Sequence, residues 1–164
     1  MTECCGKQDG CCSSATPDVR IEVVSQARYL AGARDLVRAV AGRLGFDAAQ
    51  CGRIALAVDE ALCNVINHGY DKRPDGRIWI SIWPMGDPMP ERPTGIRIVI
   101  EDNAKQVDPE KIKPRDLAEI RPGGLGVHII REVMDCATYE KRNGAGMRLT
   151  MEKKLDTCPP KDTQ

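Results

Sequence analysis

Four polar side chains recur along residues 58–70, which read "VDEALCNVINHGY". Glu60, Asn64, Asn67 and His68 are three or four residues apart, so on a helix they form one stripe about 100° wide. A carboxylate can accept a proton and an amide oxygen can bind a hard cation, so the stripe has the chemistry of a catalytic or binding edge. A solvated helix edge contains the same residue types, and spacing alone leaves both interpretations open.

Two further segments place polar or glycine residues at the ends of expected elements. The residues "EDNAKQVDP" follow an apolar strand pattern, and "PGGLGVHII" opens a helical one. Taken singly, Asp102 is also a normal strand-end turn residue, and the glycines also suit an ordinary loop. Each segment alone is a weak indication of function, and only their combination is specific.

An apolar stripe on the same helix as Glu60 fixes which way the polar stripe faces. It consists of Ile54, Val58, Ala61, Leu62 and Val65. This spacing predicts a core-facing helix that begins at the N-cap Asp47 and ends near Gly69. A preceding amphipathic helix is expected over 25–44, with Ser25 as its N-cap and Gly45 as its C-terminal stop.

The remaining elements are mostly strands. Alternating, β-rich patterns predict strands over 19–24, 77–83, 96–102, 136–142 and 146–154. Four prolines exclude regular structure from 84–95, periodicity is lost over 103–124, and a helix begins near Leu125. The aperiodic stretch is long enough to suggest a functional lid, and "NGAG" predicts a hairpin between the last two strands.

This order of elements predicts an α+β fold: a two-layer sandwich with the helices on one face of a mixed, mostly antiparallel sheet. The chain of 164 residues suits one domain. We expect it over 18–155, between a disordered cysteine-rich tail over 1–17 and a flexible C-terminal tail over 156–164.

Composition excludes several functional classes. The 24 basic and 24 acidic residues give no net charge, which argues against a nucleic-acid-binding face. No apolar run approaches the roughly 18–20 residues of a membrane span. The N-terminus lacks the apolar stretch of a secretory signal, so we expect a cytoplasmic protein whose eight cysteines are thiols.

The cysteines fall into two groups. Cys51, Cys63 and Cys136 lie in apolar-patterned segments and are expected to pack. The others include Cys4, Cys5, Cys11 and Cys12, which form "CC-x5-CC" near the N-terminus. This cluster is either part of a disordered tail or a soft-metal or redox site, and adjacent cysteines are poor chelators of zinc.

In their order and separations, the three segments resemble the GHKL (Bergerat-fold) ATP-binding superfamily. The likeness extends over about residues 19–154 and is greatest to bacterial anti-sigma-factor serine/threonine protein kinases. "VDEALCNVINHGY" resembles the N-box of that family, "EDNAKQVDP" its first glycine box and "PGGLGVHIIREVMD" its second. The resemblance implies a homodimer that binds ATP and Mg²⁺, a sigma factor and a STAS-type anti-anti-sigma protein, without direct contact to nucleic acid or membrane.

The resemblance also assigns roles to individual residues. Glu60 would be the catalytic general base, Asn64 the Mg²⁺ ligand, and Asp102 the acceptor for the adenine amine. The expected ATP-binding residues are Asn64, His68, Asp102, Ala104, Val107, Arg121, Gly124, Leu125 and Gly126. Arg121 is equally well a solvated charge, and His68 suits capping or packing as well as a place beside the phosphates.

One position departs from the family pattern. The first glycine box usually reads Asp-x-Gly, whereas this chain has Ala104 in the third position. If the backbone there has positive φ, alanine costs roughly 1 kcal/mol or more, and its methyl group narrows the adenine pocket.

Two functions follow from these expectations. The first is an ATP-dependent serine/threonine protein kinase that phosphorylates a protein antagonist and also binds a sigma factor. The second, motivated by Ala104 and the N-terminal cysteines, is an ATP-sensing switch that sequesters a partner without phosphorylating it. The catalytic part of a two-component histidine kinase fits less well, because His68 and His128 both lie within the expected nucleotide domain.

Overall fold

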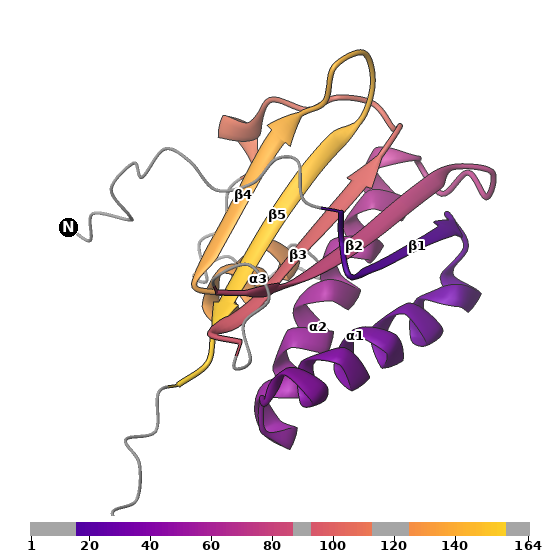
Figure 1. Ribbon diagram of the computed structural model, residues 1–164. Helices are drawn as coiled ribbons and strands as arrows, with labels where there is room; N and C mark the ends of the chain where they lie inside the picture. Colours follow the sequence, from indigo (N-terminus) through magenta and orange to yellow (C-terminus); the bar gives the residue numbers. More distant parts are fainter. Residues whose placement is uncertain (1–15, 87–92, 113–124, 157–164) are drawn as a thin grey trace, which may run out of the picture.

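The computed structural model describes residues 16–86, 93–112 and 125–156. They form two layers, a five-stranded sheet and three α-helices (Figure 1). The order of elements is the expected one, so the α+β sandwich predicted from the sequence is confirmed. Within the described ranges, no helix is long and apolar enough to cross a membrane.

The sheet has the strand order β1-β2-β3-β5-β4, with every neighbouring pair antiparallel. The described strands include no parallel pair, so the expected mixed sheet is corrected to a uniformly antiparallel one. Its strands are β1 (Val19–Val24), β2 (Arg77–Met85), β3 (Gly95–Asp102), β4 (Cys136–Lys141) and β5 (Met147–Lys154).

Strict alternation along the central strands builds the core. The isoleucines at 78, 80, 82, 96, 98 and 100 all face the helices and are at most 1% exposed. Their neighbours in the chain, such as Trp79 and Glu101, lie on the opposite face, which none of the described helices covers. We call this surface the open face of the sheet.

The three α-helices pack on the other face. They are α1 (Leu30–Leu44), α2 (Ala48–Asn64) and α3 (Gly126–Val133). Asp47 caps α2 as predicted: its carboxylate accepts from Gln50 N at 2.7 Å, and the Gln50 side chain completes a capping box. Gly45 ends α1 with φ 107°, as expected for a left-handed C-terminal residue.

Two local expectations are wrong for reasons that involve distant residues. Ser25 does not cap the first helix; its hydroxyl donates to Arg73 O and accepts from Gly76 N at 2.9 Å. Pro84 lies inside β2, where it is paired with Ile96. Proline is tolerated there because the pairing of β1 with β2 reaches only Ile82, so Pro84 has a strand on one side only.

The helix predicted to end near Gly69 does so through an unusual last turn. Residues Val65–Gly69 are π-helical, and Tyr70 N donates to Val65 O at 2.9 Å. Asp71 and Lys72 then adopt positive φ values of 50° and 63°. Such π-helical turns often occur at functional sites, and this one directly follows Asn64.

Other expectations can be followed only in part. The predicted hairpin is present, with Gly144 and Gly146 at φ 90° and 86°. Within the expected lid, Pro109–Lys111 forms a short 3₁₀ helix, while residues 113–124 lie outside the described ranges. The cysteine cluster and both predicted tails, apart from Thr16, Pro17 and Asp156, also lie outside them.

Candidate nucleotide site

A cavity of about 340 Å³ lies between the sheet and the helices α2 and α3. Ile100, Leu149 and Tyr139 are neighbours across β3, β5 and β4 and form part of its lining. The π-helical turn and the start of α3 add His68 and Gly126. A mostly apolar cavity with a few polar groups is typical of a small-molecule site.

The last two turns of α2 bring Glu60 and Asn64 against the start of α3. A Cβ atom built on Gly126 would lie 2.7 Å from Glu60 Oε2 and 3.2 Å from Asn64 Nδ2. Only glycine permits this approach without displacing the two side chains. Asn64 and Gly126 line the cavity, and Glu60 lies beside it, half-buried. A proton acceptor, an amide oxygen and a helix N-terminus therefore meet in one cluster.

Asp102 supplies a buried acceptor to the same cavity. It is 3% exposed at the end of β3, and its Oδ1 accepts from Ala104 N at 2.8 Å and Met147 N at 3.2 Å. None of the described residues donates to Oδ2. Burial raises the pKa of this carboxyl, although the two amides and the charge of Arg142 oppose that shift. Oδ2 is thus available to a donor group on a ligand.

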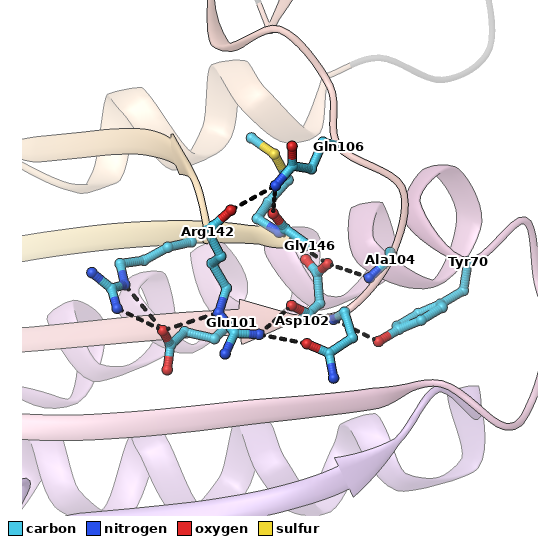
Figure 2. Close-up of polar contacts among 10 residues, drawn as sticks. Tyr70, Glu101, Asp102, Ala104, Gln106, Arg142 and Gly146 are labelled. Atoms are coloured by element: carbon cyan, nitrogen blue, oxygen red, sulfur yellow. Dashed lines mark hydrogen bonds and ion pairs between the residues drawn. The ribbon is translucent and has the colours of Figure 1, made fainter. Parts of the chain in front are cut away.

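The backbone around Asp102 is held from several directions (Figure 2). The Tyr70 hydroxyl accepts from Asn103 N at 2.9 Å and donates to Arg77 O at 2.6 Å. Arg142 Nη1 donates to Asp102 O at 2.5 Å. Gly146 passes so close that a Cβ atom there would overlap the same carbonyl oxygen. These contacts fix the turn that carries the carboxylate.

Ala104 is accommodated without the expected strain. Asp71 and Lys72 are the only non-glycine residues of the described ranges with positive φ, so the condition under which alanine would be strained at position 104 is not met. Ala104 is buried but does not line the cavity. A Cβ atom built on Gly69 would lie 2.9 Å from the Ala104 methyl group, so glycine on the π-helical turn provides the space that this methyl occupies.

The other expected binding residues have different positions. His68 and Val107 line the cavity, whereas Asn67 and the exposed Leu125 do not. Arg121 and Gly124 lie outside the described ranges. Among the described residues, no three His, Cys, Asp or Glu side chains gather into a metal site.

Several lining residues were missed by the sequence interpretation. They include Lys105, Lys111, Tyr139 and Met147. Lys105 lies within the segment that was singled out, but its place depends on an ion pair with Asp71, at 3.0 Å from Nζ to Oδ1. Tyr139 and Met147 face inward on their strands, which alternation predicts without indicating a cavity.

Comparison with known proteins identifies the family of the chain. Residues 23–153 match the model of the histidine kinase-like ATPase domain. The chain is 30% identical over 143 residues to the serine-protein kinase RsbW of Oceanobacillus iheyensis, covering 82% of this chain and 85% of that protein. It is 29% identical to an anti-sigma F factor of Clostridium botulinum, covering 84% and 94% of the two chains.

Solved structures share the fold. The RsbU and RsbW domains of a Mycobacterium tuberculosis protein match with a TM-score of 0.56 at 17% identity, over 85% of this chain and 33% of the longer one. The histidine kinase domain of a blue-light activated kinase from Erythrobacter litoralis matches with a TM-score of 0.50 at 21% identity, over 79% and 60%. The chain belongs to the histidine kinase-like ATPase (GHKL) family and is similar, within it, to the anti-sigma-factor kinases.

Proposed function

We propose that this protein is an ATP-dependent serine/threonine protein kinase of the anti-sigma-factor type. It would bind a sigma factor and transfer the γ-phosphoryl group of ATP to a serine of a STAS-type anti-anti-sigma protein. The proposal is supported by the names of its relatives, which include serine-protein kinases and anti-sigma factors.

One observation carries the chemistry. Glu60 and Asn64 meet at Gly126, beside a cavity that Asn64 and Gly126 line together with the buried Asp102. A nucleotide with its base at Asp102 and its phosphates at Gly126 would present the γ-phosphoryl group close to Glu60. Phosphoryl transfer depends mostly on such positioning and on charge neutralisation.

The residues present fit a magnesium ion held jointly with phosphate oxygens. The Asn64 Oδ1 atom is a hard, neutral ligand, and Gly126 leaves room beside it because a Cβ atom there would lie 3.5 Å from Oδ1. Bound Mg²⁺ would neutralise charge on the phosphate oxygens. The remaining ligands would come from the phosphates and water, as is usual for this ion.

Glu60 would act as the general base. As the serine oxygen forms its bond to the γ-phosphorus, the bond from that phosphorus to the β–γ bridging oxygen breaks and ADP leaves. The serine proton moves to the Glu60 carboxylate, which then releases it to solvent. Half-burial of Glu60 beside the cavity is compatible with approach of a hydroxyl group from a second protein.

Within the same cavity, Asp102 Oδ2 would accept a hydrogen bond from the adenine amine. Guanine has a carbonyl oxygen at that position, which would leave a buried acceptor facing an acceptor. The backbone around Leu125 and Gly126 would offer amide donors to the phosphates, with His68, Val107 and, by family resemblance, Arg121 and Gly124 around the nucleotide.

The names of the relatives support a proposal about the cellular context. We propose a cytoplasmic homodimer that holds a sigma factor until an unphosphorylated antagonist competes for it. A phosphoserine would weaken the antagonist by adding negative charge to its interface with the kinase. Sedimentation of the purified chain tests the dimer: a single species at monomer mass over a wide concentration range contradicts it.

Incubation with γ-labelled ATP, Mg²⁺ and purified STAS-type domains tests the kinase activity. We expect label on a serine of the cognate domain, and none when Glu60→Gln replaces the native chain. Binding of ATP without any labelled partner would instead favour the non-catalytic switch. Failure to bind ATP at all would contradict both functions.

A further inference from the structure

Arg142 lies in the β4–β5 hairpin, outside every motif that the sequence singled out, yet it reaches the turn that carries Asp102 (Figure 2). Its Nη1 atom donates to Asp102 O at 2.5 Å and to Asn103 Oδ1 at 2.7 Å. The side chain approaches from the open face, where it lies over the Trp79 ring at 5.3 Å and its Nε is 3.4 Å from Glu101 Oε1.

The hairpin that holds Arg142 is itself attached to the same segment. Gln106 Nε2 donates to Arg142 O at 2.7 Å and to Gly146 O at 3.3 Å. Met147 N, directly after the hairpin, donates to Asp102 Oδ1. The backbone carbonyl of Asp102 is therefore held from the open face while its carboxylate is held from the hairpin strand, and both contacts depend on one loop.

We propose that Arg142 is a positioning residue for nucleotide recognition, which holds the Asp102 backbone from the open face so that Oδ2 presents its lone pairs to the base. The identity of the ligand rests on the proposed function, whereas the hydrogen bond from Arg142 to the Asp102 backbone does not depend on it. Arg142 touches neither the cavity nor any reacting atom. It acts through the orientation and the charge of Asp102.

The charge of Arg142 adds to its contacts. Burial raises the pKa of the Asp102 carboxyl, and Arg142 is the cation that opposes this shift. The Tyr70 hydroxyl lies against the same turn, where it accepts a hydrogen bond from Asn103 N, while His68, Lys105 and Lys111 line the same cavity. Glu101 faces the open side, where Arg142 and Arg148 pair with it.

Removing Arg142 should then have two linked effects. The turn at Asp102 loses the charge-assisted hydrogen bond from the Arg142 guanidinium, so ATP affinity falls about tenfold while GTP affinity changes little. The carboxyl of Asp102 also becomes easier to protonate, so the decline of ATP affinity in acid begins at a higher pH. A protonated Asp102 no longer offers a charged acceptor to the adenine amine.

The experiment compares Arg142→Met, Arg142→Lys and the matched control Arg148→Met in the full chain. Arg148 also pairs with Glu101 on the open face, through Nε at 3.0 Å and Nη2 at 2.9 Å, but none of its described contacts is to Asp102 or Asn103. Calorimetric titration with ATP and with GTP over an acid-to-neutral pH series gives affinity and selectivity. A ¹³C NMR titration of the free protein gives the pKa of Asp102 directly.

We expect Arg142→Met to weaken ATP binding, to reduce the ratio of ATP affinity to GTP affinity and to raise the pKa of Asp102. Arg142→Lys keeps the positive charge, so its ATP affinity should depend on pH more nearly as in the native chain than that of Arg142→Met does. Arg148→Met should resemble the native chain. Equal effects of Arg142→Met and Arg148→Met, or an Asp102 pKa that does not change without Arg142, overturn the proposal. If the native chain binds no ATP, the proposed function fails, and the NMR titration still decides the role of Arg142.

Discussion

Replacing Gly126 by alanine should slow phosphoryl transfer while it leaves the stability of the protein nearly unchanged. The new Cβ atom would lie 2.7 Å from Glu60 Oε2 and 3.2 Å from Asn64 Nδ2, both closer than ordinary side-chain contacts. The atoms it meets are the ends of side chains, which can rotate away while the helices stay in place. Gly126 has no positive φ, so alanine suits its backbone.

The expected magnitude follows from this geometry. The carboxylate and the amide must each move by several tenths of an ångström or more, and a displacement of about 1 Å in a reacting group can cost about 100-fold in rate. We therefore expect a 10- to 100-fold slower phosphoryl transfer. Stability should change by no more than about 1 kcal/mol, because alanine is the better helix former by a similar amount.

Single-turnover transfer to the antagonist domain measures the rate, and urea denaturation measures the free energy of unfolding. Gly52→Ala is the matched control: Gly52 lies on α2, and a Cβ atom there has nothing within 4 Å. It should leave transfer unchanged. A Gly126→Ala protein that transfers phosphate at the native rate would refute the idea that Glu60 and Asn64 act from their observed positions.

Three other changes test the packing and charge around the site. Ala104→Gly should lower stability by about 1 kcal/mol, because a buried methyl group is lost and the unfolded chain becomes more flexible. ATP affinity should not change. Tighter ATP binding by the variant would contradict the conclusion that Ala104 is accommodated without strain. Tyr139→Phe should raise stability by about 1 kcal/mol in urea denaturation, because the buried Tyr139 hydroxyl has no hydrogen-bond partner among the described residues. Burial also raises the pKa of Tyr139 to about 12, and a loss of stability in the variant would refute this expectation. For Asp135, burial raises the carboxyl pKa but the bonds from Lys153 Nζ and Lys154 N outweigh it, so the pKa is lowered. That stabilisation is present above the unfolded-state pKa and lost as pH falls through the folded-state pKa. The Asp135 side chain is 40% exposed, so solvent screens its charge, and Asp135→Asn should cost no more than about 0.5 kcal/mol at neutral pH and nothing in strong acid. A cost that does not depend on pH would contradict this explanation.

Most of the fold could be predicted because its signals are local. Alternating isoleucines specify β2 and β3, and the Asp47 capping box specifies the start of α2. The errors concern residues whose partners are distant in sequence. Ser25 contacts a loop about 50 residues away, and the place of Pro84 depends on where β1 ends.

The candidate site could be predicted only as far as its motifs extend. Glu60, Asn64 and Asp102 lie in patterned segments, so their types and spacing were informative. Arg142 and Tyr139 lie on a hairpin and an edge strand, and only the pairing of β4 with β5 brings them to the site. The space for the Ala104 methyl group depends on Gly69, a contact across 35 positions that no local pattern contains.

In the proposed reaction, Glu60 accepts the proton of a serine hydroxyl during phosphoryl transfer from ATP. The most direct test of this role is the single-turnover rate of transfer to the antagonist serine, measured for the native chain and for Glu60→Gln at saturating Mg-ATP. A general base contributes about 100- to 10,000-fold to the rate, so we expect a loss of that size with an unchanged Kd for ATP. Transfer by Glu60→Gln at the native rate would contradict it.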